Sequence, residues 1–262
     1  MTTLSALRSV LVCTIAFSAG PAFGQHDHHS PSSTDESKQH GAPAADAPAS
    51  QSNNRIGDPY PLGMCPVSGK KFGAMGDADI KVYEGHEVRF CCSKCPPKFE
   101  KDLPASTAKL DAKIAEDQRP LYPLTTSVVT GKDLPAKPYE FVFGNRLIRL
   151  GAESEKEMFF QNPKKYLAEI DAAAIKAQTD TYPLTKCPVS DEDLGGAMGE
   201  ADSIVVGGRM IQICCADCKS GIEKDPAKYL NMVDQARKSK SVDSEAGNDK
   251  KNSHGEHMHG DN

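Results

Sequence analysis

Tryptophan is absent from the sequence, and aromatic residues of all kinds make up only 6% of its 262 residues. Hydrophobic residues together account for 38%. A single large core built on aromatic side chains is therefore not expected. For a chain of this length, two or three small domains are the better prediction.

An excess of positive charge is also missing. The net charge is −5 at pH 7, the isoelectric point is near 5.9, and Lys and Arg are interspersed with Asp and Glu. Nucleic-acid binding needs a clustered basic surface, so we expect no nucleic-acid partner. The sequence also shows no Ser-His-Asp arrangement, phosphate-binding loop or pair of catalytic acids in a convincing context. We therefore do not expect an enzyme.

Long hydrophobic runs are missing after the N-terminus. Residues 1–24 carry Arg8, an apolar run at residues 10–17 and small residues up to Gly24, which is the pattern of a signal peptide. The run is too short to span a bilayer, which weighs against a membrane anchor. We predict an exported protein, periplasmic or secreted, with no stable membrane insertion after cleavage. Cleavage removes Cys13, one of nine cysteines, and leaves eight.

Residues 25–57 and 238–262 have too few large apolar side chains to fold, and we predict that both are disordered tails. They contain seven of the eight histidines, and His86, the remaining one, aligns with Arg209 and is expected to be an exposed turn residue. The tails combine imidazole and carboxylate groups, which suits weak capture of Cu(II), Ni(II) or Zn(II). The alternative is a solvated tail that merely contains histidine. The candidates for capture are His26, His28, His29, His254, His257 and His259.

Between the tails the chain repeats itself about every sixty residues. The segments "YPLGMCPVSGKKF", "YPLTTSVVTGKDL" and "YPLTKCPVSDEDL" begin three similar units. Repeat 1 is assigned to residues 58–118, repeat 2 to residues 119–179 and repeat 3 to residues 180–237.

Each repeat reads as a turn at "CPVS" or its equivalent, a β-hairpin and a helix. The helix should begin at the cysteines and end near Asp102 in repeat 1 and before Pro226 in repeat 3, since residues before proline avoid helical dihedrals. A second helix is predicted at residues 227–236. The fold class is α+β, with three tandem small modules. The predicted strands of repeats 1 and 3 are residues 80–83, 87–90, 203–206 and 210–213.

Four cysteines recur at matching positions in repeats 1 and 3. In repeat 2 the corresponding residues are Ser127, Gly151, Ala152 and Glu155, although the strand-turn-strand pattern remains. Because the four sulfurs are lost together, we expect them to act as one functional unit. The comparison also suggests that the fold can form without them, at least when two repeats that have them flank it. The alternative is that repeat 2 depends on its neighbours for stability. The candidate metal ligands are Cys65, Cys91, Cys92, Cys95, Cys187, Cys214, Cys215 and Cys218.

A site for a soft metal ion needs deprotonated ligands that converge from separate segments. Cys65 lies on a turn, and the other cysteines of repeat 1 lie where the hairpin meets a helix, whose free amides and dipole favour thiolates. The adjacent Cys91 and Cys92 cannot easily point the same way, so we expect three main ligands: Cys65, Cys95 and one of the pair. Three thiolates suit Cu(I), whereas a fourth ligand would complete tetrahedral Zn(II).

The stretch "CPVSGKKF…VYEGHEVRFCCSKCPPKFEKD" resembles the YHS and TRASH-like family of small metal-binding modules. Their pattern is one Cys, then Cys-x3-Cys at a hairpin-helix junction, then Phe and an Asp-Pro-x-x-Tyr ending. The resemblance covers most of residues 58–237 and implies a treble-clef-like fold and a role in heavy-metal sensing, trafficking or resistance, often with copper. The family pattern favours Cys91 as a ligand, whereas the spacing along a helical turn favours Cys92. The matching cysteines are Cys65, Cys91, Cys95, Cys187, Cys214 and Cys218.

Two other functions would use the same cysteines. In an exported protein an even set of cysteines is a disulfide framework by default, and small repeats gain stability from one, which would fit a structural or interaction role. The segments "CSKC" and "CADC" are also Cys-x-x-Cys motifs at a helix start, as in thiol oxidoreductases. The flanking hairpin, however, is not the strand-helix-strand unit that makes such a motif informative.

Of these functions, we expect binding of a heavy metal ion, Cu(I) or Zn(II), by cysteine thiolates. The expected role is metal sequestration, trafficking or resistance. The expected partners are metal ions, with a metal efflux or trafficking protein as a further candidate.

Overall fold

The computed structural model describes residues 54–73, 76–197 and 199–252, with side chains described up to residue 240. The predicted signal peptide and almost all of the predicted N-terminal tail lie outside these residues. The capture of metal by histidines therefore stays a prediction. The six histidines concerned, all outside the described residues, are His26, His28, His29, His254, His257 and His259.

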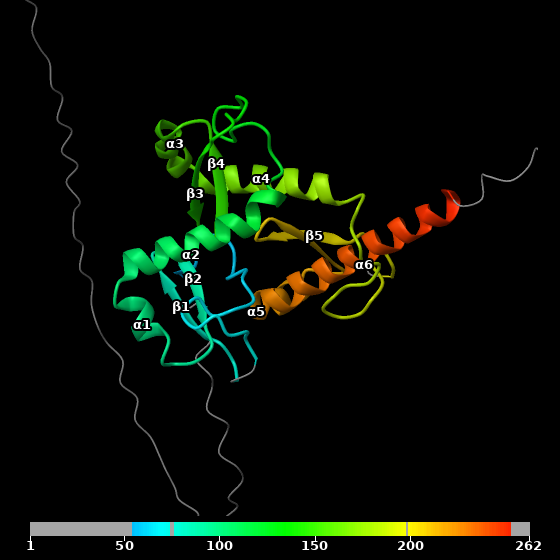
Figure 1. The fold of residues 1–262 in the computed structure, drawn as a ribbon, viewed down its shortest axis with the longest axis horizontal. Helices are drawn as coiled ribbons and strands as arrows, with labels where there is room; N and C mark the ends of the chain where they lie inside the picture. Colours follow the sequence, from blue (N-terminus) through cyan, green and yellow to red (C-terminus); the bar gives the residue numbers. More distant parts are fainter. Residues whose placement is uncertain (1–53, 74–75, 198, 253–262) are drawn as a thin grey trace, which may run out of the picture. The chain divides into compact units, whose positions relative to one another are not determined.

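Mixed helices and small antiparallel hairpins make up the described chain, which confirms the α+β class (Figure 1). Each repeat contributes one two-stranded sheet, and the strands predicted in repeats 1 and 3 are present, each one residue longer at its start. The first strand of each hairpin pairs with the second along its full length. The strands are β1 (Asp79–Tyr83), β2 (His86–Phe90), β3 (Tyr139–Phe143), β4 (Arg146–Leu150), β5 (Asp202–Val206) and β6 (Arg209–Ile213).

The three hairpins close through the same kind of turn. Both turn residues have positive φ in every case, which is the type I′ geometry that matches the twist of antiparallel strands. Glycine or asparagine therefore fills at least one position of each turn, because these residues tolerate a left-handed backbone. The turn residues are Glu84, Gly85, Gly144, Asn145, Gly207 and Gly208.

Two helices follow each hairpin, with a sharp break between them. The break is at Asp102 in repeat 1, at Asn162 in repeat 2 and at Asp225 in repeat 3, and in each repeat this side chain accepts a hydrogen bond from an amide three residues later. A cap residue followed closely by proline starts a helix efficiently. The helices are α1 (Pro96–Glu100), α2 (Leu103–Gln118), α3 (Lys156–Gln161), α4 (Pro163–Gln178), α5 (Cys218–Lys224) and α6 (Pro226–Asn252), with 3₁₀ turns at Arg119–Leu121 and Glu153–Glu155.

The last helix differs from its prediction. We expected a helix over residues 227–236 and a disordered tail from residue 238, but α6 continues to Asn252. Its added part contains Ala, Glu, Lys and Ser, and no proline interrupts it. Extending a helix that has already begun by packing needs no new nucleation step, which offsets the low helix propensity of Gly247 and Asn248 in this part.

A separate hydrophobic core lies in each repeat. Equivalent residues of the short helices anchor the three cores: Phe99, Phe159 and Ile222, with relative exposures of 3%, 0% and 0%. In repeats 1 and 3 the cysteine side chains belong to the core cluster. The sulfurs are therefore held in the interior of each repeat.

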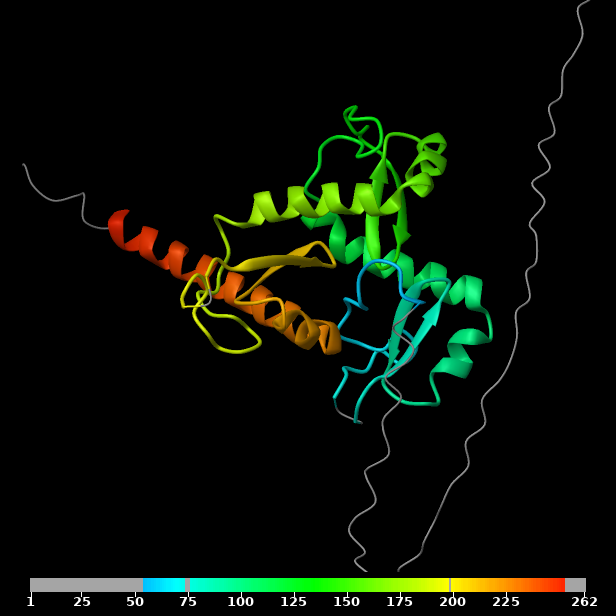
Figure 2. The same ribbon diagram turned by 180° about the vertical axis from the view of Figure 1, so that it is seen from behind.

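The repeats are joined through the ends of their long helices. Gln118, the last residue of α2, donates to the carbonyl of Asn145 at 2.8 Å and accepts from the amide of Leu147 at 2.9 Å. Gln178, the last residue of α4, makes the same two bonds to the β5–β6 hairpin, at 2.8 and 3.0 Å. Each helix thus fixes the hairpin of the next repeat (Figures 1 and 2).

A second set of junctions starts from the first residue of β2, β4 and β6. Here His86, Arg146 and Arg209 each face an aspartate of the following long helix, at 3.7, 2.6 and 2.9 Å respectively. The prediction that His86 is an exposed turn residue is wrong, because it begins β2 and packs towards α2 with 15% of its side chain exposed.

Arg146 connects all three repeats. Its side chain is 2% exposed and donates to both carboxylate oxygens of Asp58, at 2.9 and 3.1 Å, as well as to Asp171. It also donates to the carbonyl of Val205 at 3.2 Å. Burial opposes its charge, but the two carboxylates outweigh this and raise the pKa of the guanidinium.

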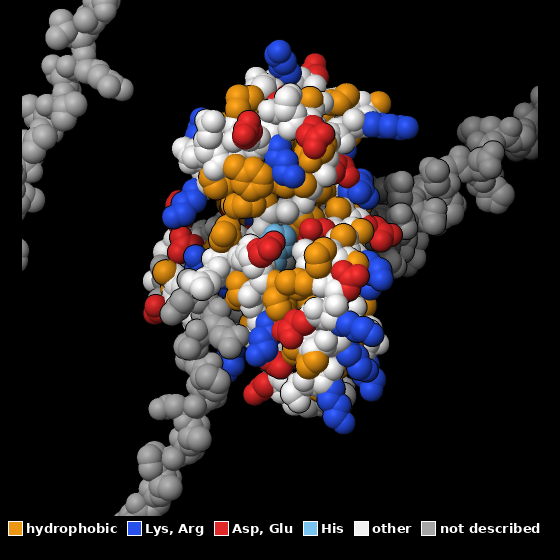
Figure 3. Space-filling view, turned by 90° about the vertical axis from the view of Figure 1, so that its left-hand side faces the viewer, with side chains coloured by type: hydrophobic (Ala, Val, Ile, Leu, Met, Phe, Trp, Pro, Cys, Tyr) orange, Lys and Arg blue, Asp and Glu red, His pale blue; other side chains and the backbone are white. Residues whose placement is uncertain are grey.

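No helix in the described part of the chain combines the length and the hydrophobicity that crossing a bilayer requires. On the face shown in Figure 3, acidic and basic side chains are intermixed, with hydrophobic side chains between them. Among the exposed hydrophobic residues, Phe160 and Met158 lie on α3 of repeat 2.

Candidate metal centre

A tight turn presents the first sulfur of each centre. In repeat 1 the amide of Cys65 donates to the carbonyl of Lys70 at 2.8 Å, and the amide of Gly69 donates back to the carbonyl of Cys65 at 2.9 Å. Gly69 has a φ of 68°, which favours glycine. Repeat 3 closes the same turn with Asp191 at a φ of 62°. The turn leaves the side chain of Cys65 fully buried, facing the hairpin.

The hairpin-helix junction supplies two further sulfurs in repeat 1. Cys91 follows the last residue of β2, and Cys95 is the N-cap residue of α1. The sulfurs of Cys91 and Cys95 lie 3.8 Å apart, and those of Cys65, Cys91 and Cys95 all lie within 4.8 Å of one another. Each of the three residues is at most 5% exposed. The structure thus joins Cys91 rather than Cys92 to Cys65 and Cys95.

Repeat 3 builds the same cluster. The sulfurs of Cys187, Cys214 and Cys218 lie within 4.8 Å of one another, and the Cys214 and Cys218 sulfurs are 3.7 Å apart. All three residues are buried, with at most 7% exposure. Two centres of the same composition therefore occur in one chain.

The spacing of the sulfurs fits a shared metal ion. Thiolate sulfurs at about 2.3 Å from one ion lie roughly 3.8 Å apart when they are arranged tetrahedrally around it. The observed separations of 3.7 and 3.8 Å match this geometry. Only small side-chain movements would be needed to bring each cluster of three onto one soft ion.

Cys92 and Cys215 occupy a different place from the buried clusters. Both are partly exposed. The sulfur of Cys92 lies 3.8 Å from that of Cys95, and the sulfur of Cys215 lies 3.8 Å from that of Cys218 and 3.9 Å from that of Cys214. They form the outer edge of each centre.

One thiol in each centre is prepared to lose its proton. Burial opposes ionisation of Cys65, but hydrogen bonds from the Ser68 side chain and from the amides of Cys91, Ser68 and Val67 outweigh it and lower the pKa to about 7. The equivalent environment in repeat 3 lowers the pKa of Cys187 to about 6, again against burial. At neutral pH these two cysteines are the preferred thiolates.

The thiols at the start of α1 and α5 are harder to ionise. Burial, followed by hydrogen bonding within the cluster, raises the pKa of Cys95 to about 12, and the same causes raise the pKa of Cys218 to about 12. A metal ion would therefore have to displace their protons, so metal binding would release protons and weaken in acid.

Serines beside the sulfurs are a feature that sequence reasoning missed. The hydroxyl oxygen of Ser68 lies 3.2 Å from the sulfur of Cys91, and that of Ser190 lies 3.2 Å from the sulfur of Cys214. The signal that could have found them is the recurrence of "CPVS", with its serine, in both repeats that have the cysteines.

In repeat 2 the equivalent place is occupied by a group of hydrogen-bonded oxygen and nitrogen atoms instead of sulfurs. Ser127, which replaces the first cysteine, is 1% exposed and donates a short hydrogen bond to the carboxylate of Glu155, which replaces the last. Thr130 and the amide of Gly151 also donate to this carboxylate, at 3.3 and 3.2 Å. A closed hydrogen-bond cluster thus replaces the thiol cluster.

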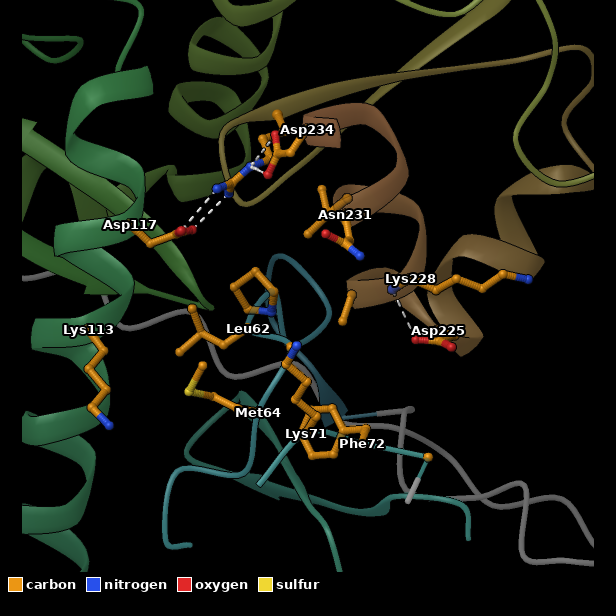
Figure 4. A pocket seen from close by; sticks show the side chains of 16 residues that line it. Leu62, Met64, Lys71, Phe72, Lys113, Asp117, Asp225, Lys228, Asn231 and Asp234 are labelled. Carbon is orange, nitrogen blue, oxygen red and sulfur yellow. Dashed lines mark hydrogen bonds and ion pairs between the residues drawn. The ribbon is translucent and has the colours of Figure 1, made fainter. Parts of the chain in front are cut away.

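A cavity of about 580 Å³ lies beside repeat 1 and repeat 3 (Figure 4). Met64, next to Cys65, faces it together with Lys113 of α2, while Asp234 of α6 and Asp117 of α2 bind Arg209 at its edge. Its described lining residues include no cysteine. The cavity is therefore separate from the two thiol centres.

All eight cysteines of the described residues are free thiols. The short sulfur-sulfur separations within the two centres, 3.7 to 3.9 Å, are far longer than a disulfide bond of about 2.05 Å. Comparisons of the chain with models of known protein families, with curated proteins and with solved structures found no match. The site is therefore interpreted from its own geometry.

Proposed function

We propose that this chain is an exported heavy-metal-binding protein that holds two soft metal ions, Cu(I) or Zn(II), in thiolate centres of treble-clef-like modules of the YHS and TRASH type. Its role would be metal sequestration, trafficking or resistance. The observation that carries this proposal is the buried cluster of three sulfurs that recurs in repeats 1 and 3.

The ligand atoms available in each centre favour a soft metal ion. Three buried thiolates without a carboxylate or imidazole in the cluster suit Cu(I), and Zn(II) would require one further ligand to complete a tetrahedron. Cys92 and Cys215 are near enough to supply that ligand. Either ion would pull the turn and the hairpin-helix junction together.

Metal counting on variants tests the proposal. Protein purified without oxygen and loaded with Cu(I), or separately with Zn(II), should bind two ions per chain. Cys65→Ser and Cys187→Ser should each bind one ion, and the double variant none. Two ions bound to a folded double variant, or none bound to the wild-type chain, would overturn the proposal.

The predicted tails suggest a division of labour in which histidines collect metal ions and the thiolates hold them more tightly. Deletion of residues 25–53 and 253–262 should then weaken Cu(II) capture and leave the thiolate stoichiometry at two ions. Unchanged Cu(II) affinity would reject the capture role. N-terminal sequencing of the exported protein should begin at Gln25 if the signal peptide is cleaved as predicted.

A thiol oxidoreductase is the second candidate, because an exposed cysteine precedes a buried one in a Cys-x-x-Cys motif at a helix start. The amide of Lys94, followed by the Cys95 side chain, lowers the pKa of Cys92, as in attacking cysteines of such enzymes. Disulfide reductase turnover that is lost in Cys92→Ser and kept in Cys65→Ser would favour this candidate over metal binding.

A further inference from the structure

Each thiol centre has one sulfur at the surface and three in the interior. Cys92 and Cys215 are partly exposed, whereas the residues of the two buried clusters are at most 7% exposed. A metal ion that arrives bound to another molecule cannot reach the buried sulfurs first. The exposed sulfur is the part of the centre that it would meet.

The last cysteine of each cluster, at the start of α1 or α5, is positioned to share an ion with either set of sulfurs. The sulfur of Cys95 lies 3.8 Å from Cys92 on the outside and 3.8 Å from Cys91 on the inside. In repeat 3 the sulfur of Cys218 has the same relation to Cys215 and Cys214, at 3.8 and 3.7 Å. These are the separations at which two sulfurs at about 2.3 Å from an ion can bind it together.

Local sequence explains why the arrangement repeats. In "CCxxC" the first and last cysteines are four positions apart and the second and last are three apart, so both earlier side chains lie near the last one across the turn that leads into α1 or α5. The amide of Cys95 donates to the carbonyl of Cys92 at 3.1 Å, and the amide of Cys218 donates to that of Cys215 at 3.2 Å. This turn keeps the outer sulfur beside the sulfur of the last cysteine.

Repeat 2 provides an internal comparison. Ala152 occupies the position in repeat 2 that corresponds to Cys92 and Cys215. The cysteines of the buried cluster are also replaced in this repeat. The outer sulfur therefore accompanies the inner cluster in both repeats that have one and is absent where the cluster is absent.

We propose that Cys92 and Cys215 are exchange ligands through which a metal ion passes between the buried cluster and a thiol-bearing carrier. This inference rests on the proposed function. In the first step a bond forms between the ion and the outer sulfur while a bond to the carrier sulfur breaks. In the next steps the inner sulfurs replace the remaining carrier sulfurs, and finally the outer one.

The exchange involves no change of oxidation state. Each protein thiol that binds the ion releases its proton, and each carrier thiolate that leaves can take one up. The partner implied by this chemistry is a molecule that presents the ion on accessible thiolates. Glutathione with bound Cu(I) is a simple probe of that class.

The test compares wild-type protein with the Cys92→Ser/Cys215→Ser variant, both supplied with Cu(I)-glutathione under anaerobic conditions. Stoichiometry and affinity are measured by competition with a colorimetric Cu(I) chelator, and the rate of transfer by stopped-flow absorbance. We expect two ions per chain in both proteins, affinities within about threefold, and transfer at least tenfold slower in the variant.

Ser93→Ala, which changes an exposed neighbour of Cys92, is the matched control and should transfer at the wild-type rate. Equal rates in wild type and the double variant would overturn the inference, as would a large loss of affinity, which would make the outer cysteines permanent fourth ligands. Both results leave the proposed function intact, whereas failure of the wild-type protein to bind metal overturns both.

Discussion

Repeats 1 and 3 differ from repeat 2 in what lies at the hairpin-helix junction, although the three share their turns, hairpins and helix breaks. The outer repeats bury three thiols there, and repeat 2 buries Ser127 against the carboxylate of Glu155. The comparison teaches that the backbone frame does not need sulfur. It needs the buried position on the turn to have a partner, because an unpaired buried polar group is costly.

The largest expected effect comes from placing cysteines in repeat 2 at the positions that carry them in repeats 1 and 3. A Cβ atom on Gly151 would lie 2.7 Å from a carboxylate oxygen of Glu155, so cysteine at Gly151 fits only when Glu155 is also replaced. The variant Ser127→Cys/Gly151→Cys/Glu155→Cys should bind a third metal ion. A thiolate site of this kind contributes on the order of 10 kcal/mol of binding free energy.

Elemental analysis of the loaded variant, with circular dichroism as a check of folding, measures this outcome. The variant Ser127→Ala/Gly151→Ala/Glu155→Ala, which also removes Glu155 but adds no sulfur, is the control and should remain at two ions. A folded triple variant that still binds two ions would show that sulfurs on this frame are insufficient for a metal centre.

The next largest effect concerns the guanidinium that joins the repeats. Arg146→Ala should lower the free energy of unfolding by about 3 kcal/mol, because it leaves the largely buried carboxylate of Asp58 and the partly exposed carboxylate of Asp171 without their cation. Urea denaturation of the metal-free protein measures this change.

Arg119→Ala is its control, since Arg119 is 48% exposed and its ion pair with Glu140 should contribute less than about 1 kcal/mol. Similar losses for the two variants would contradict the assignment of Arg146 as the connection between repeats.

Much of the frame could be predicted from sequence because its signals are local. The turn residues and the alternating strands place the predicted strands of repeats 1 and 3 within one residue, and the prolines place the breaks that end the short helices of these repeats. The long helices were predicted less well, because α2 was not predicted and α6 continues to Asn252, well past its predicted end at residue 236. The partners of Gln118 and Arg146 could not be predicted, because these contacts join residues of different repeats whose packing no local pattern encodes.

The candidate site was predictable in composition and less so in detail. The joint loss of four cysteines from repeat 2 indicated that they form one site. The sequence did not decide whether Cys91 or Cys92 belongs to the buried cluster. The choice depends on the direction of each side chain at the strand end, and the structure turns Cys91 inward and Cys92 outward. Ser127 and Glu155 show why repeat 2 tolerates the loss, and only the folded arrangement brings them together.

A smaller effect tests how repeat 2 replaces the thiols. Ser127→Ala removes the hydrogen bond to Glu155 and should lower the free energy of unfolding by about 1 to 2 kcal/mol, with the metal stoichiometry unchanged at two. Thermal unfolding of the metal-free protein reports this change. Thr130→Ala, which removes a longer and exposed bond, should change it by less than about 0.5 kcal/mol. The account of repeat 2 fails if Ser127→Ala is as stable as the wild type.

The smallest effect uses the histidine that distinguishes repeat 1. His86 and Asp111 lie 3.7 Å apart, and their facing atoms have no hydrogen-bond partner among the described residues. Burial lowers the pKa of His86 and raises the pKa of Asp111 to about 6. The unfolded chain releases the Asp111 proton first, so this carboxyl costs stability as the pH rises from about 4 to about 6.

Asp111→Asn should therefore stabilise the protein at pH 8 by about 1 kcal/mol, less than the full shift implies because the carboxyl is partly exposed, and should have no such benefit at pH 4. Asp234→Asn, at the equivalent position in repeat 3, should destabilise it because Asp234 binds Arg209 at 2.9 Å. If both variants changed the free energy of unfolding in the same direction at pH 8, the proposed difference between the His86–Asp111 and Arg209–Asp234 pairs would be contradicted.

The central claim is that two ions are bound by sulfur alone. X-ray absorption spectroscopy of the protein loaded anaerobically with two equivalents of Cu(I) tests it most directly. The account predicts a first shell of about three sulfur atoms at about 2.3 Å per ion, unchanged when the histidine-containing tails are deleted. A first shell made mainly of nitrogen or oxygen, or one that disappears with the tails, would contradict it.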